Sequence, residues 1–288
     1  MRKIGVVMTL ESSTSFAGKT VIVTGASSGI GAATLRAFAS QGARVAAVAR
    51  TRVNLEARTE ELTKLGFTAE AFVADISDEA AMVAVFEQVS ERFGGIDVLV
   101  NNAAINHRGP FEEATPAQLS EVILTNLLAP ALLMRLALPY MRKRGGGAIV
   151  NVASLAGRVP LIYEAAYSAS KFGLRGLSFA VADELAGSGI SVSIVSPGPV
   201  STGFILSDME SVSDVVFSQP MSSPEEIARL IVACALDGKQ ERTPSWLVRV
   251  TSTVGYLFPA LRRATTPILQ RRGRAAKDQY RAKHPGHS

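Results

Sequence analysis

A tyrosine and a lysine four residues apart, Tyr167 and Lys171, occupy a segment whose pattern predicts a helix over residues 163–186. A spacing of i to i+4 places both side chains on one helix face. The pKa of a free phenol is about 10, and an adjacent ammonium, together with the positive charge of a bound oxidised cofactor, would favour the phenolate that acts as a base near neutral pH. In the opposite direction the same phenol donates a proton to an oxygen that gains charge. The pair therefore predicts an acid/base centre.

Ser154 lies thirteen residues before this tyrosine, directly after a short run, residues 148–152, that predicts a strand. A hydroxyl at the end of a strand can stabilise a carbonyl oxygen as an oxyanion donor. Each residue also has an ordinary interpretation: Tyr167 as a core aromatic, Lys171 as a surface cation and Ser154 as a helix cap. Their joint order and spacing favour the chemical interpretation.

The elements that position these residues follow an alternating pattern. Short β-branched runs alternate with longer helical patterns, which predicts βαβ units and one α/β domain: a doubly wound, Rossmann-like parallel sheet with helices on both faces. Ligands of such sheets bind at the carboxyl ends of the strands. The expected strands are 20–24, 44–49, 69–74, 96–100, 148–152 and 190–195, and the expected helices are 30–40, 53–65, 78–93, 116–144 and 163–186.

A glycine-rich turn, Thr24 to Gly31, joins the first expected strand to the first expected helix. Glycines let a pyrophosphate approach the backbone, and the helix N-terminus supplies N–H donors for it, although such turns also make ordinary tight connections. At the end of the second strand, where a carboxylate would hold the ribose of NAD, the chain has Arg50. A guanidinium there can pair with a 2′-phosphate; the alternative is a solvated strand end.

The turn has the spacing TGxxxGxG and resembles that of the short-chain dehydrogenase/reductase family. Further similarities extend from Phe16 to Leu236. Asp75 matches the family's adenine-contacting aspartate. Residues 101–104 match its NNAG segment, with Ala104 in place of the glycine, and residues 197–202 match a PG segment that contacts the nicotinamide. The resemblance implies a nicotinamide dinucleotide as cofactor, and Arg50 favours its phosphorylated form, NADP(H).

The resemblance also completes a catalytic set. It adds Asn126, which is expected to hold a water linking Lys171 to solvent, and it implies that Lys171 lowers the pKa of Tyr167 and binds ribose. The implied reaction transfers a hydride between nicotinamide and a carbonyl or secondary alcohol. The expected catalytic residues are Asn126, Ser154, Tyr167 and Lys171. The expected cofactor-binding residues are Gly25, Ser27, Ser28, Gly29, Ile30, Gly31, Arg50, Asp75, Ile76, Asn102, Ala103, Tyr167, Lys171, Pro197, Gly198, Val200 and Thr202.

Composition excludes several other classes of site. Cys234 is the single cysteine, which excludes an intrachain disulfide, and two of the three histidines lie in the last five residues, so no metal site is expected. No uninterrupted apolar stretch approaches the roughly 20 residues of a membrane-spanning helix. We expect a cytoplasmic protein with a loose N-terminal tail over 1–15, the domain over 16–249 and an extension over 250–288.

The region after residue 203 has two unusual parts. We expect residues 204–220 to form an apolar substrate lid, with about half of its apolar side chains packed in the core. The other half would present an apolar surface that favours a lipophilic substrate over a small charged acid. We expect the last strand at Trp246–Val248. Beyond it an apolar helical pattern, interrupted by Pro259 and Pro267, leads into a basic cluster.

The extension has two equally weighted interpretations. It could lie on an anionic membrane at the inner face, or it could pack over the domain or a dimer partner, trailed by a disordered basic end. The lack of stacking aromatics argues against nucleic acid. The family resemblance implies a homo-oligomer, a dimer or tetramer joined through the helices 116–144 and 163–186. Two rival functions stay open: a nucleotide-binding scaffold that has lost the chemistry, and an epimerase or dehydratase.

Overall fold

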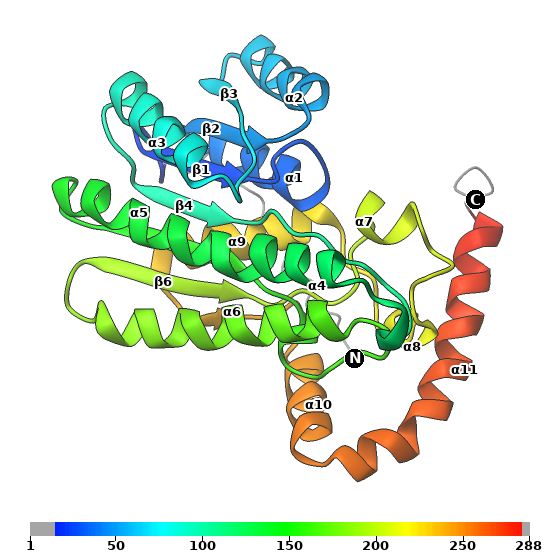
Figure 1. The fold of residues 1–288 in the computed structure, drawn as a ribbon. Helices are drawn as coiled ribbons and strands as arrows, with labels where there is room; N and C mark the ends of the chain where they lie inside the picture. Colours follow the sequence, from blue (N-terminus) through cyan, green and yellow to red (C-terminus); the bar gives the residue numbers. More distant parts are fainter. Residues whose placement is uncertain (1–14, 284–288) are drawn as a thin grey trace, which may run out of the picture.

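A computed structural model of the chain describes residues 15–283, and its centre is a seven-stranded parallel sheet (Figure 1). The strand order is β3-β2-β1-β4-β5-β6-β7, so the winding direction changes between β1 and β4. Such a change of direction opens a crevice at the carboxyl ends of the strands. The strands are β1 (Thr20–Thr24), β2 (Arg44–Ala49), β3 (Ala69–Val73), β4 (Val98–Asn101), β5 (Gly147–Val152), β6 (Ile190–Val195) and β7 (Glu241–Arg242).

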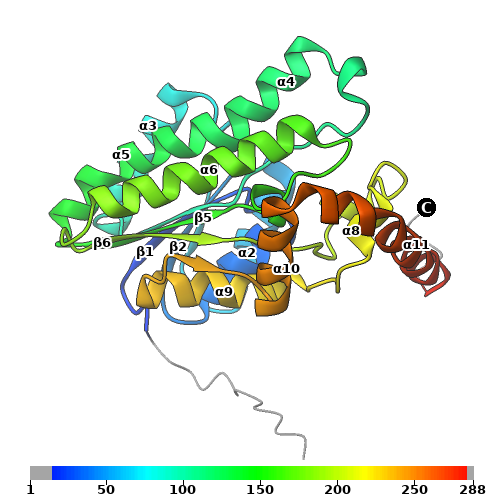
Figure 2. The ribbon, with the colours of Figure 1, turned by 90° about the horizontal axis from the view of Figure 1, so that it is seen from below.

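Helices cover both faces of the sheet, which Figure 2 shows edge-on. One apolar core packs α1, α2 and α9 against the sheet, and the other packs α3, α5 and α6 against its opposite face. These helices are α1 (Gly29–Ala39), α2 (Arg52–Lys64), α3 (Glu79–Phe93), α4 (Pro116–Ile123), α5 (Ala129–Lys143), α6 (Ala165–Glu184) and α9 (Pro224–Asp237), with short 3-10 turns η1 (Phe111–Glu113) and η3 (Leu155–Gly157). The predicted fold class is confirmed.

The helix expected over residues 116–144 is continuous in direction but contains a π-helical turn, η2 (Leu124–Leu128), between α4 and α5. Pro130 has no N–H to donate to the carbonyl of Asn126, four residues earlier. The N–H of Ala129 donates to the carbonyl of Leu124, five residues earlier, which is the hydrogen bond of a π-helical turn. Residues 116–143 are long and apolar enough to cross a membrane, with a mean hydropathy of 1.7 over the best window. Their buried side chains, including Leu133 and Met141, lie in the core against the sheet.

The prediction for the last strand was wrong. The final strand is β7, whose two residues pair with Ile194 and Val195, whereas Trp246–Val248 form the first turn of α10 (Trp246–Leu257). The side chain of Trp246 is 75% exposed, so its apolar character does not mark a sheet position. The short edge strand is polar because Glu241 takes part in a buried ion-pair network, which no local pattern indicates.

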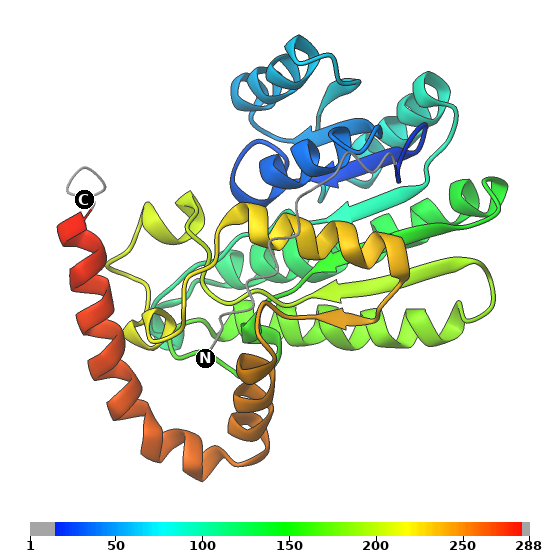
Figure 3. The same ribbon diagram turned by 180° about the vertical axis from the view of Figure 1, so that it is seen from behind.

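The C-terminal extension consists of two helices that arc away from the domain and return beside the lid (Figure 3). The predicted boundary at residue 250 falls inside α10. A break at Phe258 separates α10 from α11 (Pro259–Lys283), as expected from Pro259, but α11 runs on through Pro267. The predicted N-terminal tail lies, apart from Ser15, outside the described residues.

Candidate active site

A large cleft of about 1150 Å³ opens at the carboxyl ends of the central strands. Its volume exceeds the roughly 300–1,000 Å³ of a usual small-molecule site, which leaves space for more than one ligand. All the predicted site residues line it except Gly31 and Asn126. The topology therefore brings together side chains that are spread over residues 25–202.

The glycine-rich turn is shaped by close backbone contacts. A Cβ atom on Gly31 would lie 2.1 Å from the carbonyl oxygen of Gly25, so a side chain there would break the turn. Asn102, directly after the neighbouring strand β4, holds the turn in place because its Nδ2 donates to the carbonyl of Thr24 at 2.9 Å. Ser28, the N-cap of α1, makes no side-chain capping bond. The first-turn N–H donors of α1 are therefore free of that hydroxyl, which fits a pyrophosphate.

Arg50 lies beside the cleft, and its guanidinium is 3.6 Å from the carboxylate of Asp75. Burial would raise the pKa of Asp75, but hydrogen bonds from Ser77 and the charge of Arg50 outweigh it and lower that pKa. Thr51, which sequence reasoning missed, also lines the cleft and caps α2 without a side-chain hydrogen bond. The donors of Arg50 and of the α2 N-terminus suit a phosphate at this end.

Tyr167 and Lys171 lie together on α6, and both are buried. Burial raises the pKa of Tyr167 to about 12, against the opposing effects of a hydrogen bond with Ser154 and the charge of Arg108. Burial also lowers the pKa of Lys171 to about 7. The lysine Nζ lies 5.6 Å from the tyrosine ring centre and donates to the carbonyl of Val152 at 2.9 Å.

The expected lowering of the Tyr167 pKa is therefore not found in the chain alone. Desolvation of the phenol outweighs the nearby charges, and the same desolvation weakens the ammonium form of Lys171. A protonated phenol beside Ser154 is suited to donate a proton to a substrate oxygen. To act as a base near neutral pH, Tyr167 needs a further positive charge in the cleft.

Ser154 caps a short helix and also contacts Tyr167, while its role as a donor to a substrate oxygen stays a prediction. Its hydroxyl accepts a hydrogen bond from the Ala156 N–H at 3.1 Å, which caps η3, and it also contacts the Tyr167 phenol. A hydroxyl held by a backbone N–H and directed at the tyrosine is oriented before any substrate arrives.

Asn126 is fully buried behind the cleft in the π-helical turn. Its Nδ2 donates to the Ile105 carbonyl at 2.8 Å and to Ser170 Oγ at 3.1 Å, and its Oδ1 accepts from the Ile105 N–H. These bonds connect the loop after β4 with the helix of Tyr167 and Lys171. The water relay expected for Asn126 stays a prediction.

A buried polar group that sequence reasoning missed lies beside Tyr167. Glu164 is 4% exposed, accepts a hydrogen bond from Asn106 Nδ2 at 2.7 Å and pairs with Arg108 at 3.5 Å. Burial raises the pKa of Glu164 in spite of Arg108 and Asn106. Glu164 raises the pKa of Tyr167 whereas Arg108 lowers it. The pair therefore adjusts the charge felt by the tyrosine.

The lid consists of two short helices, α7 (Gly203–Leu206) and α8 (Asp214–Phe217). Four of its side chains form a small core of their own: Ile205, Met209, Val212 and Phe217. Phe204 faces the centre, with its ring 6.0 Å from that of Tyr167 and under the guanidinium of Arg108. Val215 and Val216 line the cleft. Of the lid's apolar side chains, Met209 and Phe217 are thus packed in the core, Phe204, Val215 and Val216 line the cleft, and Ile205 and Val212 contribute to both.

Within residues 15–283 no group of three or more His, Cys, Asp or Glu side chains could hold a metal ion. Cys234 is buried, which raises the pKa of its thiol.

Known proteins share this sequence and fold. A profile of the short chain dehydrogenase family matches residues 19–211. The ketoacyl reductase HetN of Nostoc sp. is 38% identical over 220 residues, which cover 76% of each chain. The 3-oxoacyl-[acyl-carrier-protein] reductase FabG of Thermotoga maritima is 35% identical over 224 residues, 76% of this chain and 91% of the relative.

Two solved structures resemble the chain. A metagenomic short-chain oxidoreductase in complex with NADP gives a TM-score of 0.69 at 35% identity, covering 80% of this chain and 99% of that chain. A protein from Beutenbergia cavernae, assigned as an NAD(P)-dependent gluconate 5-dehydrogenase and containing NADP at low occupancy, gives 0.72 at 34% identity, covering 81% and 98%. The chain belongs to the short-chain dehydrogenase/reductase family.

Proposed function

We propose that the protein is an NADP(H)-dependent oxidoreductase that interconverts a lipophilic carbonyl compound and its secondary alcohol. The observation that supports this most directly is the meeting of Ser154, Tyr167 and Lys171 in the cleft that also contains the glycine-rich turn. The NADP found in two similar structures and the ketoacyl reductase activity named for two relatives point the same way.

The residues of the chain divide the work as follows. The turn from Gly25 to Gly31 would hold the pyrophosphate and Arg50 the 2′-phosphate of NADP(H), which supplies or accepts the hydride. Ser154 donates a hydrogen bond to the substrate oxygen, and the Tyr167 hydroxyl transfers its proton to that oxygen as charge develops there. Lys171 binds ribose and, with a bound cationic nicotinamide, favours the phenolate in the oxidative direction; Asn126 orders the proton path.

The apolar cleft wall supports a lipophilic substrate. Phe204 and Leu161 lie near Tyr167, and Val215 and Val216 follow on the lid. Burial of each such side chain against a ligand stabilises binding in proportion to the area covered. A rate that rises with the chain length of the substrate is therefore expected.

The test is a screen of NADPH oxidation with ketones of increasing chain length, combined with a fluorescence titration of NADPH. Tight binding of NADPH without oxidation of any ketone would favour the scaffold interpretation. Preference for NADH over NADPH would contradict the role of Arg50. Conversion of a sugar without net change in NADPH would favour an epimerase.

The setting of the enzyme is also part of the proposal. We place it in the cytoplasm as a homo-oligomer joined through α4, α5 and α6, where Ile123, Leu124 and Leu128 are exposed. The exposed apolar side chains of α10, including Trp246, and the basic side chains of α11 outside the cleft, such as Arg271, would allow peripheral contact with an anionic membrane. Cross-linking and vesicle sedimentation test these two statements.

A further inference from the structure

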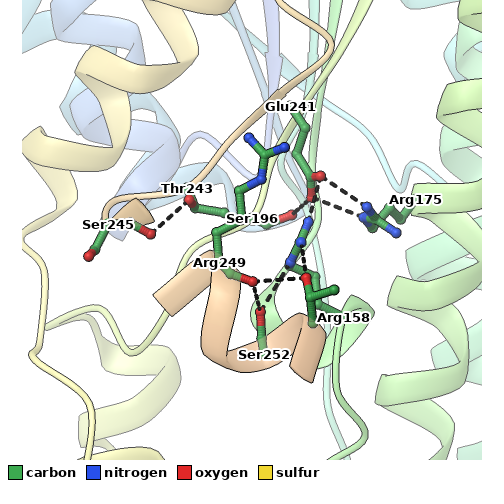
Figure 4. Close-up of polar contacts among 9 residues, drawn as sticks. Arg158, Arg175, Ser196, Glu241, Thr243, Ser245, Arg249 and Ser252 are labelled. Atoms are coloured by element: carbon green, nitrogen blue, oxygen red, sulfur yellow. Dashed lines mark hydrogen bonds and ion pairs between the residues drawn. The ribbon is translucent and has the colours of Figure 1, made fainter. Parts of the chain in front are cut away.

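The extension is held against the domain at its first helix by a buried ion-pair network (Figure 4). Arg158, which follows Ser154 in the η3 turn, donates from Nε to Ser252 at 3.2 Å and from Nη2 to Thr253 at 2.8 Å, both on α10. Its Nη1 pairs with Glu241 at 2.5 Å. Burial would raise the pKa of Glu241, but Arg175 and Arg158 lower it to about 2. The carboxylate is thus fully charged, and α10 has a fixed place.

The second helix of the extension, α11, is held against the lid near its C-terminal end. Lys277, 5% exposed, donates from Nζ to the carbonyl of Val212 at 3.2 Å and lies 3.8 Å from Asp214. Gly273 touches α8 so closely that a Cβ atom would lie 1.7 Å from the carbonyl oxygen of Asp214. Residues 246–283, hereafter the strap, are therefore anchored to Arg158, directly after the η3 turn, at one end and to the lid at the other.

Between these anchors the strap forms one wall of the catalytic cleft. Its apolar lining residues are Leu247, Val248, Val250, Val254, Leu261 and Leu269. They continue the apolar surface of Val215 and Val216, so one cleft runs from Tyr167 along the strap. The similar NADP-bound oxidoreductase is matched over 99% of its length by 80% of this chain, so a fifth of this chain has no counterpart there.

Three arginines of the strap, Arg262, Arg263 and Arg272, line the same cleft. None of them forms an ion pair within the described part of the chain, whereas Arg274 and Lys277, further along α11, both pair with Asp214. Among residues 15–283, two carboxylates line the cleft: Asp75 pairs with Arg50, and Glu164 pairs with Arg108. The strap end of the cleft is therefore positive without compensation, which attracts an anion.

We propose that the strap is part of the substrate site, and that Arg262, Arg263 and Arg272 bind the anionic end of an amphiphilic substrate whose reacting carbon lies at Tyr167. This inference rests on the proposed carbonyl reduction and names its substrate class: a carbonyl or alcohol compound with an apolar chain and a terminal carboxylate or phosphate. Guanidinium groups bind both anions in bidentate fashion, and the apolar stretch accommodates the chain between the two ends.

The experiment compares oxo acids that carry their ketone next to the terminal methyl group, six to fourteen carbons long, with their methyl esters. The ester keeps the ketone and the chain but lacks the charge. We expect kcat/KM with NADPH to favour the acid by about tenfold or more once the chain is long enough to reach the arginines. The variant R262Q/R263Q/R272Q should lose this preference, mainly through KM. The matched control Arg271→Gln removes an adjacent charge that does not line the cleft and should keep it.

Equal rates for acid and ester at every length, or a preference that survives in the triple variant, overturns the proposal. A similar loss in Arg271→Gln also overturns it, because the effect is then one of general charge. Sedimentation with phosphatidylglycerol vesicles that the triple and the control variants weaken equally, without an acid preference, assigns the arginines to a membrane instead.

A second readout separates this proposal from the proposed function. Binding of the same acids and esters to the protein loaded with NADP⁺ is measured by calorimetry, which needs no turnover. Tighter binding of the acid that depends on the three arginines, in a protein that reduces no ketone of the screen, supports the strap site and rejects the reductase. Dodecyl phosphate and inorganic phosphate, compared in the same assay, distinguish an amphiphile from a free anion.

Discussion

The two ends of the cleft are built in different ways. At the catalytic end, Ser154, Tyr167 and Lys171 lie on a strand end and one helix, so short-range spacing determines their geometry. At the strap end, α10 and α11 are placed by contacts between residues 60 to 95 positions apart, such as those of Arg158 with Thr253 and of Arg274 with Asp214. Short-range spacing in the sequence thus determines the geometry of the catalytic residues. The position of the strap, which we propose to bind the substrate, depends on contacts between residues far apart in the sequence.

The largest expected effect concerns the catalytic end. Tyr167→Phe keeps the ring but removes the proton, so turnover should fall about a thousandfold while NADPH affinity changes only a few-fold. The control is Tyr163→Phe, which alters an exposed tyrosine four residues earlier. Steady-state rates and a fluorescence titration measure both quantities, and retention of a tenth of the wild-type rate would exclude Tyr167 as the proton donor.

The second prediction breaks the anchor of the strap. Glu241→Gln leaves Arg158 and Arg175 without their carboxylate, and breaking such a buried pair should lower the free energy of unfolding by about 3 kcal/mol. Exposed Glu184→Gln should change it little. Urea denaturation provides the measurement.

The same group predicts a pH dependence. The folded-state pKa of Glu241 is about 2, below the usual 4.5, so its contribution is complete above pH 4.5 and is lost as the pH falls from 4.5 to 2. The wild type should lose stability over this interval more steeply than Glu241→Gln. Parallel curves for the two proteins would contradict the charged network.

The third prediction separates the strap from the lid. Gly273→Ala places a methyl group against the backbone of Asp214, and overpacking of this kind costs about 1–3 kcal/mol. We expect α11 to detach, with faster tryptic cleavage after its arginines and a raised KM for long substrates. Gly176→Ala on α6 is the control, because a Cβ atom there meets nothing within 4 Å. Unchanged cleavage in Gly273→Ala would show that the contact adjusts freely.

The smallest effect is expected at Arg50. Arg50→Ala should weaken NADPH by about 1.5 kcal/mol, at the low end for a charge-assisted bond because the side chain is 59% exposed, and should leave NADH almost unchanged. Arg52→Ala, which removes a neighbouring cation paired with Glu56, is the control. Calorimetric titration with both cofactors measures the difference, and an equal loss for the two would assign Arg50 another role.

The division between local and distant coding also explains what the sequence could predict. The strands, the glycine-rich turn and the pair of Tyr167 and Lys171 follow from periodicity and spacing, and Asn126 from a family resemblance. Glu164 with Asn106 and Arg158 with Glu241 are 58 and 83 residues apart, and each residue alone looks like an ordinary polar surface residue. Spacing alone does not give the Tyr167 pKa in the chain, because the burial that raises it depends on the whole fold.

The π-helical turn at Asn126 fixes the rotational phase between the two halves of one long helix. Each residue of an α-helix advances by about 100° around its axis, so the extra residue of the turn rotates everything after it relative to a regular helix. With it, Asn126 reaches Ile105 and Ser170 while Leu133 and Met141 still face the sheet. Deleting one residue within 124–128 would restore a regular helix, but either the asparagine would leave its bonds or the apolar face of α5 would turn toward solvent.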